Sequence, residues 1–226
     1  MSDGPFAAEP TDTREKIMHA TFRALREYGY AGLSIQRIAD EAGLSKSSCY
    51  HFYDGKDDLL LSFMEFMFGQ FGTGFDIRFS DDPVEDLRLH VQLMVAGPMD
   101  EDIASEILEA VPGEVPPDAP IRENNAIERG PLVEVRAQGV NEPAFRERFT
   151  EMDGMFRDTF AGIIERGIDE GVFREVDAIQ VADMLVTIGM GTIFRGATAT
   201  FDRDAAIAEA ESYIQHRLLP DGAIQE

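Results

Sequence analysis

The amino-acid sequence predicts an all-α protein, with an N-terminal three-helix helix-turn-helix domain followed by a larger helical domain and about nine or ten helices in total. Apolar residues recur at helical spacing along most of the chain, and no stretch alternates apolar and polar residues over the length of a strand. Helix-capping residues precede many of these segments, and glycines follow several of them. At 226 residues the chain is long enough to bury a substantial core.

Four helices are predicted over the first third of the chain, and most of them follow a capping residue. Gly29 and Gly43 end the first and the second of them, and the Asp54-Gly55 turn follows the third. The predicted ranges are Thr13 to about Tyr28, Ile35–Ala42 after Ser34, Ser45 to about Phe52, and about Asp57 to Phe75.

Six further helices are predicted downstream. Asp82, Asn141 and Asp177 are the expected N-caps of three of them. Four prolines make Val111–Pro120 a loop. The predicted ranges are Pro83 to about Val95, about Asp100 to Ala110, Leu132–Gln138, Glu142 to about Glu170, Ala178 to about Arg195, and Asp202 or Asp204 to near Leu218.

The chain divides into two expected domains and two expected disordered tails. The helix-turn-helix domain spans 12–56, the larger domain spans 57–219, and the tails span 1–11 and 220–226. Neither a basic, apolar leader nor a run of about 18 apolar residues is seen, which predicts a protein without signal peptide or membrane span. The single cysteine fits a reducing compartment, so we expect a cytoplasmic protein.

Charge is distributed unevenly along the chain. The formal net charge is -23, which taken globally argues against binding to nucleic acid. Residues 13–56, however, contain seven basic and five acidic residues, and all three lysines of the chain lie there. The remaining acidic, lysine-poor sequence suggests a host with a concentrated-salt cytoplasm, while an ordinary acidic protein is the alternative.

Two short helices joined by a glycine-containing turn form a helix-turn-helix in outline. A small core between them is expected from Ile38, Ala39, Leu44 and Cys49. Its place between the two helices predicts that Cys49 is a core residue. A redox switch at Cys49 is the alternative. The opposite face of the second helix is rich in hydroxyl groups and weakly basic, as a surface that contacts base edges and phosphates requires.

The run from Thr13 to Leu60 resembles the N-terminal domain of the TetR family of repressors. Three pieces carry the resemblance: G-Y-x-G-L-S-I-x-x-I-A-x-E-A-G-L-S from Gly29, Y-H-F-Y from Tyr50, and the following x-x-K-x-x-L. The aromatic order departs from the family's commoner Tyr-His-Tyr-Phe. The resemblance implies a DNA-binding homodimer with an effector-binding helical body.

The resemblance also implies roles for individual residues. Lys46, Ser47 and Ser48 correspond to positions that read base edges. Solvated positions for the two serines, and a structural role for His51, stay open. Because residues 13–56 carry a net charge of only +2, we expect a shallow salt dependence of operator binding. Contacts to phosphates or the groove are implied for Thr13, Arg14, Ser34, Gln36, Arg37, Ser45, Tyr50, His51 and Lys56.

The body offers candidates for an effector pocket and a dimer interface. The segment 178–195 is apolar on two faces, so both its own core and a second copy are expected to cover it. The pocket candidates are Phe63, Met67, Phe68, Phe71, Met94, Met152, Met155 and Phe156, for which a plain core role is the alternative. The interface candidates are Leu185, Ile188, Gly189, Thr192, Ala210, Tyr213 and Ile214.

These features predict a repressor that binds a palindromic operator as a homodimer and is released by a small, apolar effector that shifts the helix after residue 56. Glu106, Glu109 or Asp153 would instead pair with a cationic effector. A regulator without an effector, controlled by abundance or a protein partner, is the alternative, and activation is open. The sequence predicts no catalytic, metal or cofactor site, because it contains no phosphate loop, nucleophile elbow or Cys/His spacing.

Overall fold

A computed structural model describes residues 9–75, 78–96, 129–200 and 202–220. Over these ranges the chain forms nine α-helices and one 3-10 turn and contains no strand, which confirms the predicted all-α class. The helix predicted over 100–110, the loop predicted over 111–120 and most of both predicted tails lie outside the described residues.

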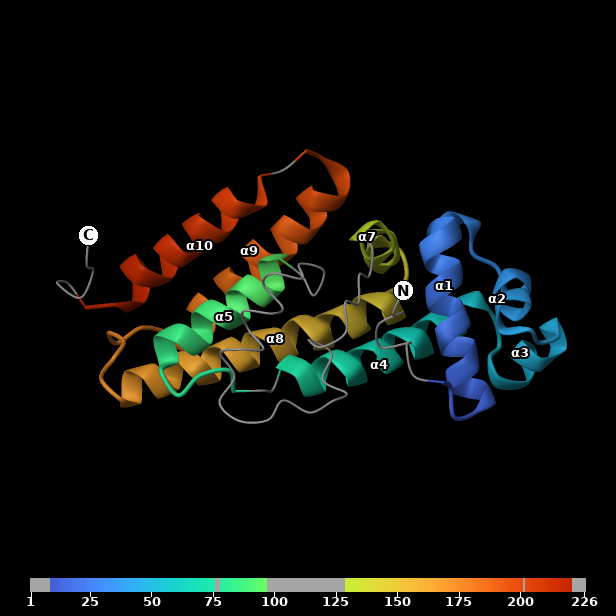
Figure 1. The fold of residues 1–226 in the computed structure, drawn as a ribbon, viewed down its shortest axis with the longest axis horizontal. Coiled ribbons are helices and arrows are strands. Elements are labelled where there is room, and N and C mark those ends of the chain that lie inside the picture. Colours follow the sequence, from blue (N-terminus) through green and yellow to red (C-terminus); the bar gives the residue numbers. More distant parts are fainter. Residues whose placement is uncertain (1–8, 76–77, 97–128, 201, 221–226) are drawn as a thin grey trace.

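The first three helices form a head at one end of an elongated molecule (Figure 1). The head consists of α1 (Thr13–Gly32), α2 (Ile35–Ala42) and α3 (Lys46–Phe52). The long helix α4 (Lys56–Phe75) begins beside α3 and leads from the head into the body.

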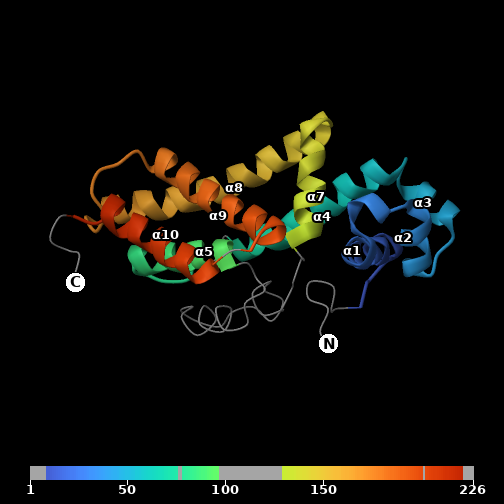
Figure 2. The same ribbon diagram turned by 90° about the horizontal axis from the view of Figure 1, so that it is seen from above.

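Five further helices build the body. The long α8 runs beside α4 and α5 and packs on α9, while α10 packs mainly on α5 (Figures 1 and 2). The short α7 contacts both α1 of the head and α9 of the body. These helices are α5 (Pro83–Ala96), α7 (Arg129–Ala137), α8 (Pro143–Asp169), α9 (Ala178–Thr198) and α10 (Arg203–Leu218), with the 3-10 turn Gln138–Val140 before α8.

Two apolar clusters form the core. The first joins the head to α4 and α8, and Ile17, Leu59 and Phe145 are almost fully buried in it. The second joins α5, α8, α9 and α10 around residues such as Phe160. Phe156 of α8 packs against both clusters, so apolar contacts continue from the head through the body.

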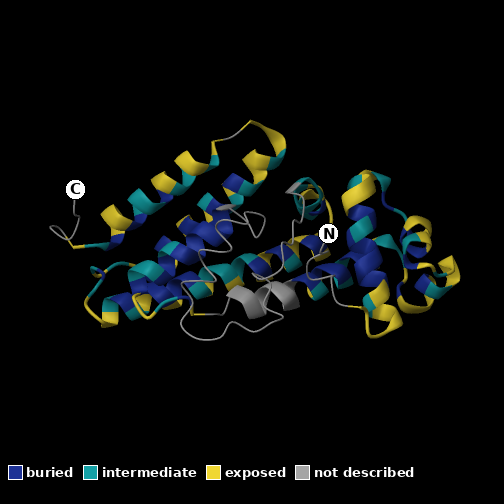
Figure 3. Ribbon diagram, in the orientation of Figure 1, coloured by how far each residue is buried: buried dark blue, intermediate teal, exposed yellow. Residues whose placement is uncertain are grey.

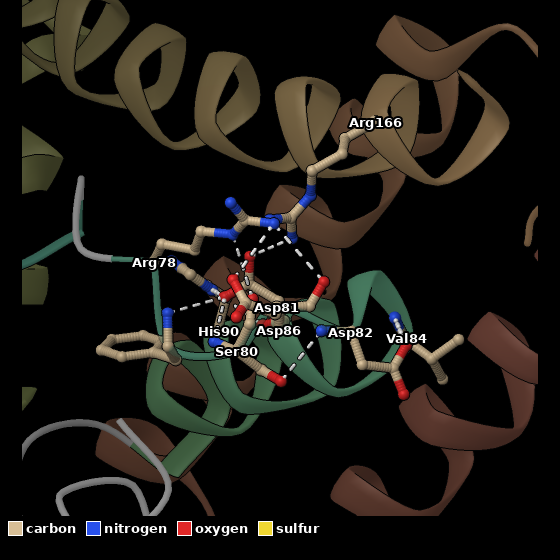
Figure 4. Close-up of polar contacts among 9 residues, drawn as sticks. Arg78, Ser80, Asp81, Asp82, Val84, Asp86, His90 and Arg166 are labelled. Carbon is tan, nitrogen blue, oxygen red and sulfur yellow. Dashed lines mark hydrogen bonds and ion pairs between the residues drawn. The ribbon is translucent and has the colours of Figure 1, made fainter. Parts of the chain in front are cut away.

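A buried carboxylate joins α5 to α8 (Figure 4). Asp86 of α5 is 1% exposed, and its Oδ2 accepts a hydrogen bond from the Arg166 guanidinium of α8 at 2.5 Å. Its Oδ1 accepts from the backbone N–H of Phe79 at 2.9 Å and lies 3.4 Å from His90 Nδ1. These partners supply the hydrogen bonds that a carboxylate needs when it is buried.

The capping residues in the sequence predicted the position of most helix ends to within a few residues. Asp177 caps α9 as predicted, since its side chain accepts from the N–H of Gln180 at 3.0 Å. The predicted cap Asn141 is wrong: Glu142 precedes the first residue of α8, which is Pro143. A proline fits this position because its fixed φ suits the first helical turn and its missing N–H would have had no helical partner.

Candidate nucleic-acid interface

Local capping fixes the two helices of the helix-turn-helix. The Ser34 side chain accepts from the N–H of Arg37 at 3.3 Å at the start of α2. Gly43 ends α2 in the left-handed region with φ 61°, which a glycine adopts without the steric cost that a Cβ brings. The Leu44 N–H then donates to the Ala39 carbonyl at 2.8 Å and closes the turn. This confirms both ends of α2 predicted from the sequence.

Three serine hydroxyls gather at the start of α3. Ser45 is the N-cap, and its Oγ accepts from the N–H of Ser48 at 3.1 Å. The same Oγ lies 2.8 Å from the hydroxyl oxygens of Ser47 and Ser48. A hydroxyl both donates and accepts, so this cluster suits base edges and phosphate oxygens alike.

The outer face of α3 is exposed while its inner face is fully covered. Lys46, Ser47 and His51 are exposed, and Tyr50 is 50% exposed. On the opposite side Cys49 is fully buried, and burial raises the pKa of its thiol. A buried thiol with a raised pKa is a poor nucleophile, which supports a core role for Cys49.

Four cations, three in the head and one at the first residue of α4, lie over tyrosine rings. The Lys56 Nζ lies 3.9 Å from the ring centroid of Tyr30, and the Arg37 guanidinium lies 4.6 Å from that of Tyr28. Two looser pairs join Lys46 to Tyr50 at 5.6 Å and Arg14 to Tyr53 at 5.9 Å. These pairs were not predicted from the sequence, although four of the five tyrosines of the chain lie in this domain.

Two of the predicted DNA contacts also have intramolecular roles. Arg37 donates to the carbonyl of Gly32 as well as stacking on Tyr28. Gln36 donates to the Asp40 carboxylate at 2.8 Å. Both side chains are exposed, so the interactions orient them without burying them. The exposed Thr13 and Arg14 begin α1, and the partly buried Lys56 begins α4.

The structure brings some of the predicted effector residues together. Phe63 and Met67 of α4 are buried in the first cluster with Met152 of α8, and Phe156 packs against them. Met94 lies in the second cluster, whereas Met155 is 42% exposed. The side chains of Phe68 and Phe71, together with Glu106 and Glu109, lie outside the described residues.

Asp153, the remaining candidate partner of a cation, is already paired inside the protein. The Arg136 guanidinium of α7 donates to both Asp153 oxygens, at 3.1 and 2.5 Å. This bidentate geometry is among the stronger ion-pair arrangements in proteins.

The predicted dimer face requires a correction. Leu185 is 1% exposed and Gly189 has Met94 of α5 directly against its Cα, so both face the chain's own core. Thr192, Ala210 and Ile214 are likewise buried, and only Ile188 and Tyr213 are partly exposed. The sequence pattern correctly indicated two apolar faces on this segment, but most of the residues predicted for the dimer interface lie on the inner, buried face.

Exposed residues lie along α9 (Figure 3), and on the face away from the core several of them carry large apolar side chains. Ile179, Met184 and Phe194 are 44%, 47% and 56% exposed. By length and composition α9 is the one described helix apolar enough to cross a membrane, a test that core helices of soluble proteins also pass. Its inner face packs on α8 and α5.

Two family models match the chain. Residues 17–63 match the model described as bacterial regulatory proteins, tetR family. Residues 130–219 match the model described as BetI-type transcriptional repressor, C-terminal. The first match covers the head and the start of α4, and the second covers α7 to α10.

Known proteins resemble the chain over different lengths. A TetR transcription regulator from Haloarcula marismortui is 34% identical with a TM-score of 0.75, and the match covers 92% of this chain and 99% of that one. A regulator from Saccharomonospora viridis, solved in complex with choline, is 22% identical with a TM-score of 0.63, covering 92% and 97%. The regulator BetI 1 from Chromohalobacter salexigens is 32% identical over 87 residues, or 38% of this chain and 43% of that protein. The chain spans less than half the length of the first curated relatives it matches.

Proposed function

Because this chain belongs to the TetR family of transcriptional regulators, we propose that it represses transcription by binding a palindromic operator as a homodimer. The observation that carries the proposal is the exposed face of α3, where serine hydroxyls, Lys46 and Tyr50 lie together. A face of this chemistry on a short helix fits the major groove. We also propose that the protein acts in the cytoplasm.

The dimer is supported by the exposed apolar residues of α9. One reading helix contacts too few base pairs for useful specificity, whereas two on a twofold axis read half-sites about one helical turn apart. Met184 and Phe194 are the apolar side chains that a second copy would cover. Ile188 and Tyr213 stay candidates for the same interface.

We infer that a small apolar effector releases the operator. The support is that Phe63 and Met67 of α4 are buried in the same apolar cluster as Met152 of α8, against which Phe156 packs. A ligand inserted there would displace α4. Lys56 at the start of α4 would then move with the head. A regulator without an effector stays the alternative, and a dry, unchanged core in every preparation would favour it.

A small organic cation such as choline is a second candidate effector. The support is the match of residues 130–219 to a BetI-type model and the choline bound by the Saccharomonospora viridis neighbour. Since Asp153 is paired with Arg136, aromatic faces such as that of Phe156 would receive the cation.

Selection of bound DNA from random duplexes tests the proposal. Wild-type protein is expected to enrich a twofold-symmetric sequence and to bind it as two chains. Phe194→Asp should give a monomer with greatly weakened operator binding, whereas Val140→Asp, at a 72% exposed apolar position outside α9, should leave both unchanged. Failure to enrich any sequence would overturn DNA reading, and a dimeric Phe194→Asp protein would overturn the interface.

The effector is tested on the selected operator. Small molecules that copurify are identified by mass spectrometry, and operator titrations are repeated with each of them and with choline. Release by an apolar compound supports the first candidate, and release by choline supports the second. Operator affinity that is unchanged by every bound compound would contradict ligand control.

A further inference from the structure

The helical backbone of α1 is interrupted near its end, at Gly29, and a side chain of the body contacts the interruption. Gly29 has φ 62° and ψ 177° inside the helix, so the backbone N–H of Tyr30 begins a new turn. Such an N–H has no helical partner. Glu134 of α7 supplies one, because its Oε2 accepts from the Tyr30 N–H at 2.5 Å. A Cβ at residue 29 would lie only 2.9 Å from this oxygen, so the glycine leaves room for the carboxylate.

The turn that Glu134 caps also holds two of the predicted DNA contacts. The Tyr30 ring carries the Lys56 ammonium at 3.9 Å, at the first residue of α4. Arg37 of α2 donates to the carbonyl of Gly32 and stacks on Tyr28. The last turn of α1 therefore meets α2, α4 and α7 in one place.

The surroundings keep the Tyr30 ring neutral. Burial raises the pKa of its hydroxyl, and the charges of Asp57 and Glu142 raise it further. A neutral ring face attracts the Lys56 ammonium, so the position of Tyr30 affects that of Lys56. The link from Glu134 to Lys56 passes through one backbone N–H and one aromatic ring.

We propose that Glu134 is a positioning residue for operator binding: its carboxylate fixes the last turn of α1 and thereby holds Lys56 toward the DNA backbone. The inference rests on the proposed function, because it requires an operator. Since α7 also packs on α9, the carboxylate joins the reading head to the helix whose exposed face we assign to the dimer. A movement of α7 in the body would therefore displace the last turn of α1 through the hydrogen bond between Glu134 and Tyr30.

A double-mutant cycle on the selected operator tests the role. Glu134→Ala is expected to weaken binding about two- to thirtyfold, the range found for substitutions that alter coupling between sites. Lys56→Ala should weaken binding in the wild type but add little in the Glu134→Ala background. Lys46→Ala, which removes a lysine held on Tyr50 of α3, should add its full effect in both backgrounds and serves as the matched control.

Glu134→Gln separates position from charge. The glutamine keeps an oxygen that accepts from the Tyr30 N–H, so it should restore most of the affinity and the dependence on Lys56. If removing a negative charge near DNA were the whole effect, Glu134→Ala and Glu134→Gln would both bind more tightly, which would overturn the proposal. Additive losses for Glu134 and Lys56, or no loss on Lys56→Ala alone, would also overturn it. A wild type that selects no duplex would instead contradict the proposed function.

Discussion

The head and the body use their cations differently. In the described body, several arginines pair with carboxylates, as Arg166 does with Asp86 and Arg136 with Asp153. Arg136 also lies 4.9 Å from the ring centroid of Phe149, and Arg146 donates to backbone carbonyls instead. In the head and at the first residue of α4, tyrosine rings lie under the cations Arg14, Arg37, Lys46 and Lys56. Arg23 is an exception, because its guanidinium lies 3.6 Å from the Glu41 carboxylate.

This difference explains how so acidic a chain can contact DNA. A carboxylate cancels the charge of the arginine it binds, whereas an aromatic ring orients a cation and leaves its charge available to phosphate. The head therefore keeps positive charge at its surface although its net charge is only +2. The body uses its ion pairs to join helices, as Asp86 and Arg166 join α5 to α8.

The largest expected effect is on the stability of the body. Asp86→Ala leaves the Arg166 guanidinium without its carboxylate, and breaking a buried pair in this way costs about 3–5 kcal/mol of unfolding free energy. Chemical denaturation measures it. Asp158→Ala, which removes an exposed carboxylate paired with Arg157, is the control and should change stability little. Equal effects of the two substitutions would contradict the assigned role of Asp86.

The same carboxylate should make stability depend on pH. Burial raises the pKa of Asp86, but His90, the Phe79 N–H and Arg166 together lower it below its ordinary value of 3.8. Its stabilising contribution is therefore present above that value and is lost as pH falls through the folded-state pKa. Denaturation curves at descending pH should show a steeper loss for wild type than for Asp86→Asn. Parallel curves would refute this assignment.

A smaller effect is expected in the head. Lys46→Ala should lower the salt slope of operator binding by about 0.9 for each phosphate that the lysine no longer neutralises. Arg157→Ala is the matched control, since its guanidinium already donates to Asp158 at 2.8 Å and should release no counterion on binding. The slopes come from operator titrations at several salt concentrations. A larger change for Arg157 than for Lys46 would reverse the comparison between head and body.

The sequence predicted the features that local chemistry determines. Both ends of α2 follow from Ser34 and Gly43, and the start of α3 follows from Ser45. The family resemblance singled out the exposed face of α3 that we propose reads DNA, because its motifs are contiguous. Gly29, expected to end the first helix, instead breaks α1, which continues to Gly32.

Features that depend on distant partners were missed. Nothing in the sequence around Glu134 points to Tyr30, which lies 104 residues away, and Asp86 is 80 residues from Arg166. On α9 both faces are apolar, so periodicity alone did not show that Leu185 faces α5 and α8 while Met184 faces outward. Only the packed arrangement distinguishes such faces.

The salt dependence of wild-type binding to its selected operator tests the central claim most directly. We predict specific binding that weakens as salt rises, with a slope smaller than that for about ten released ions per dimer. A slope of that size or larger would contradict a head that uses few, ring-oriented cations, and no specific binding at any salt concentration would contradict the reading head itself.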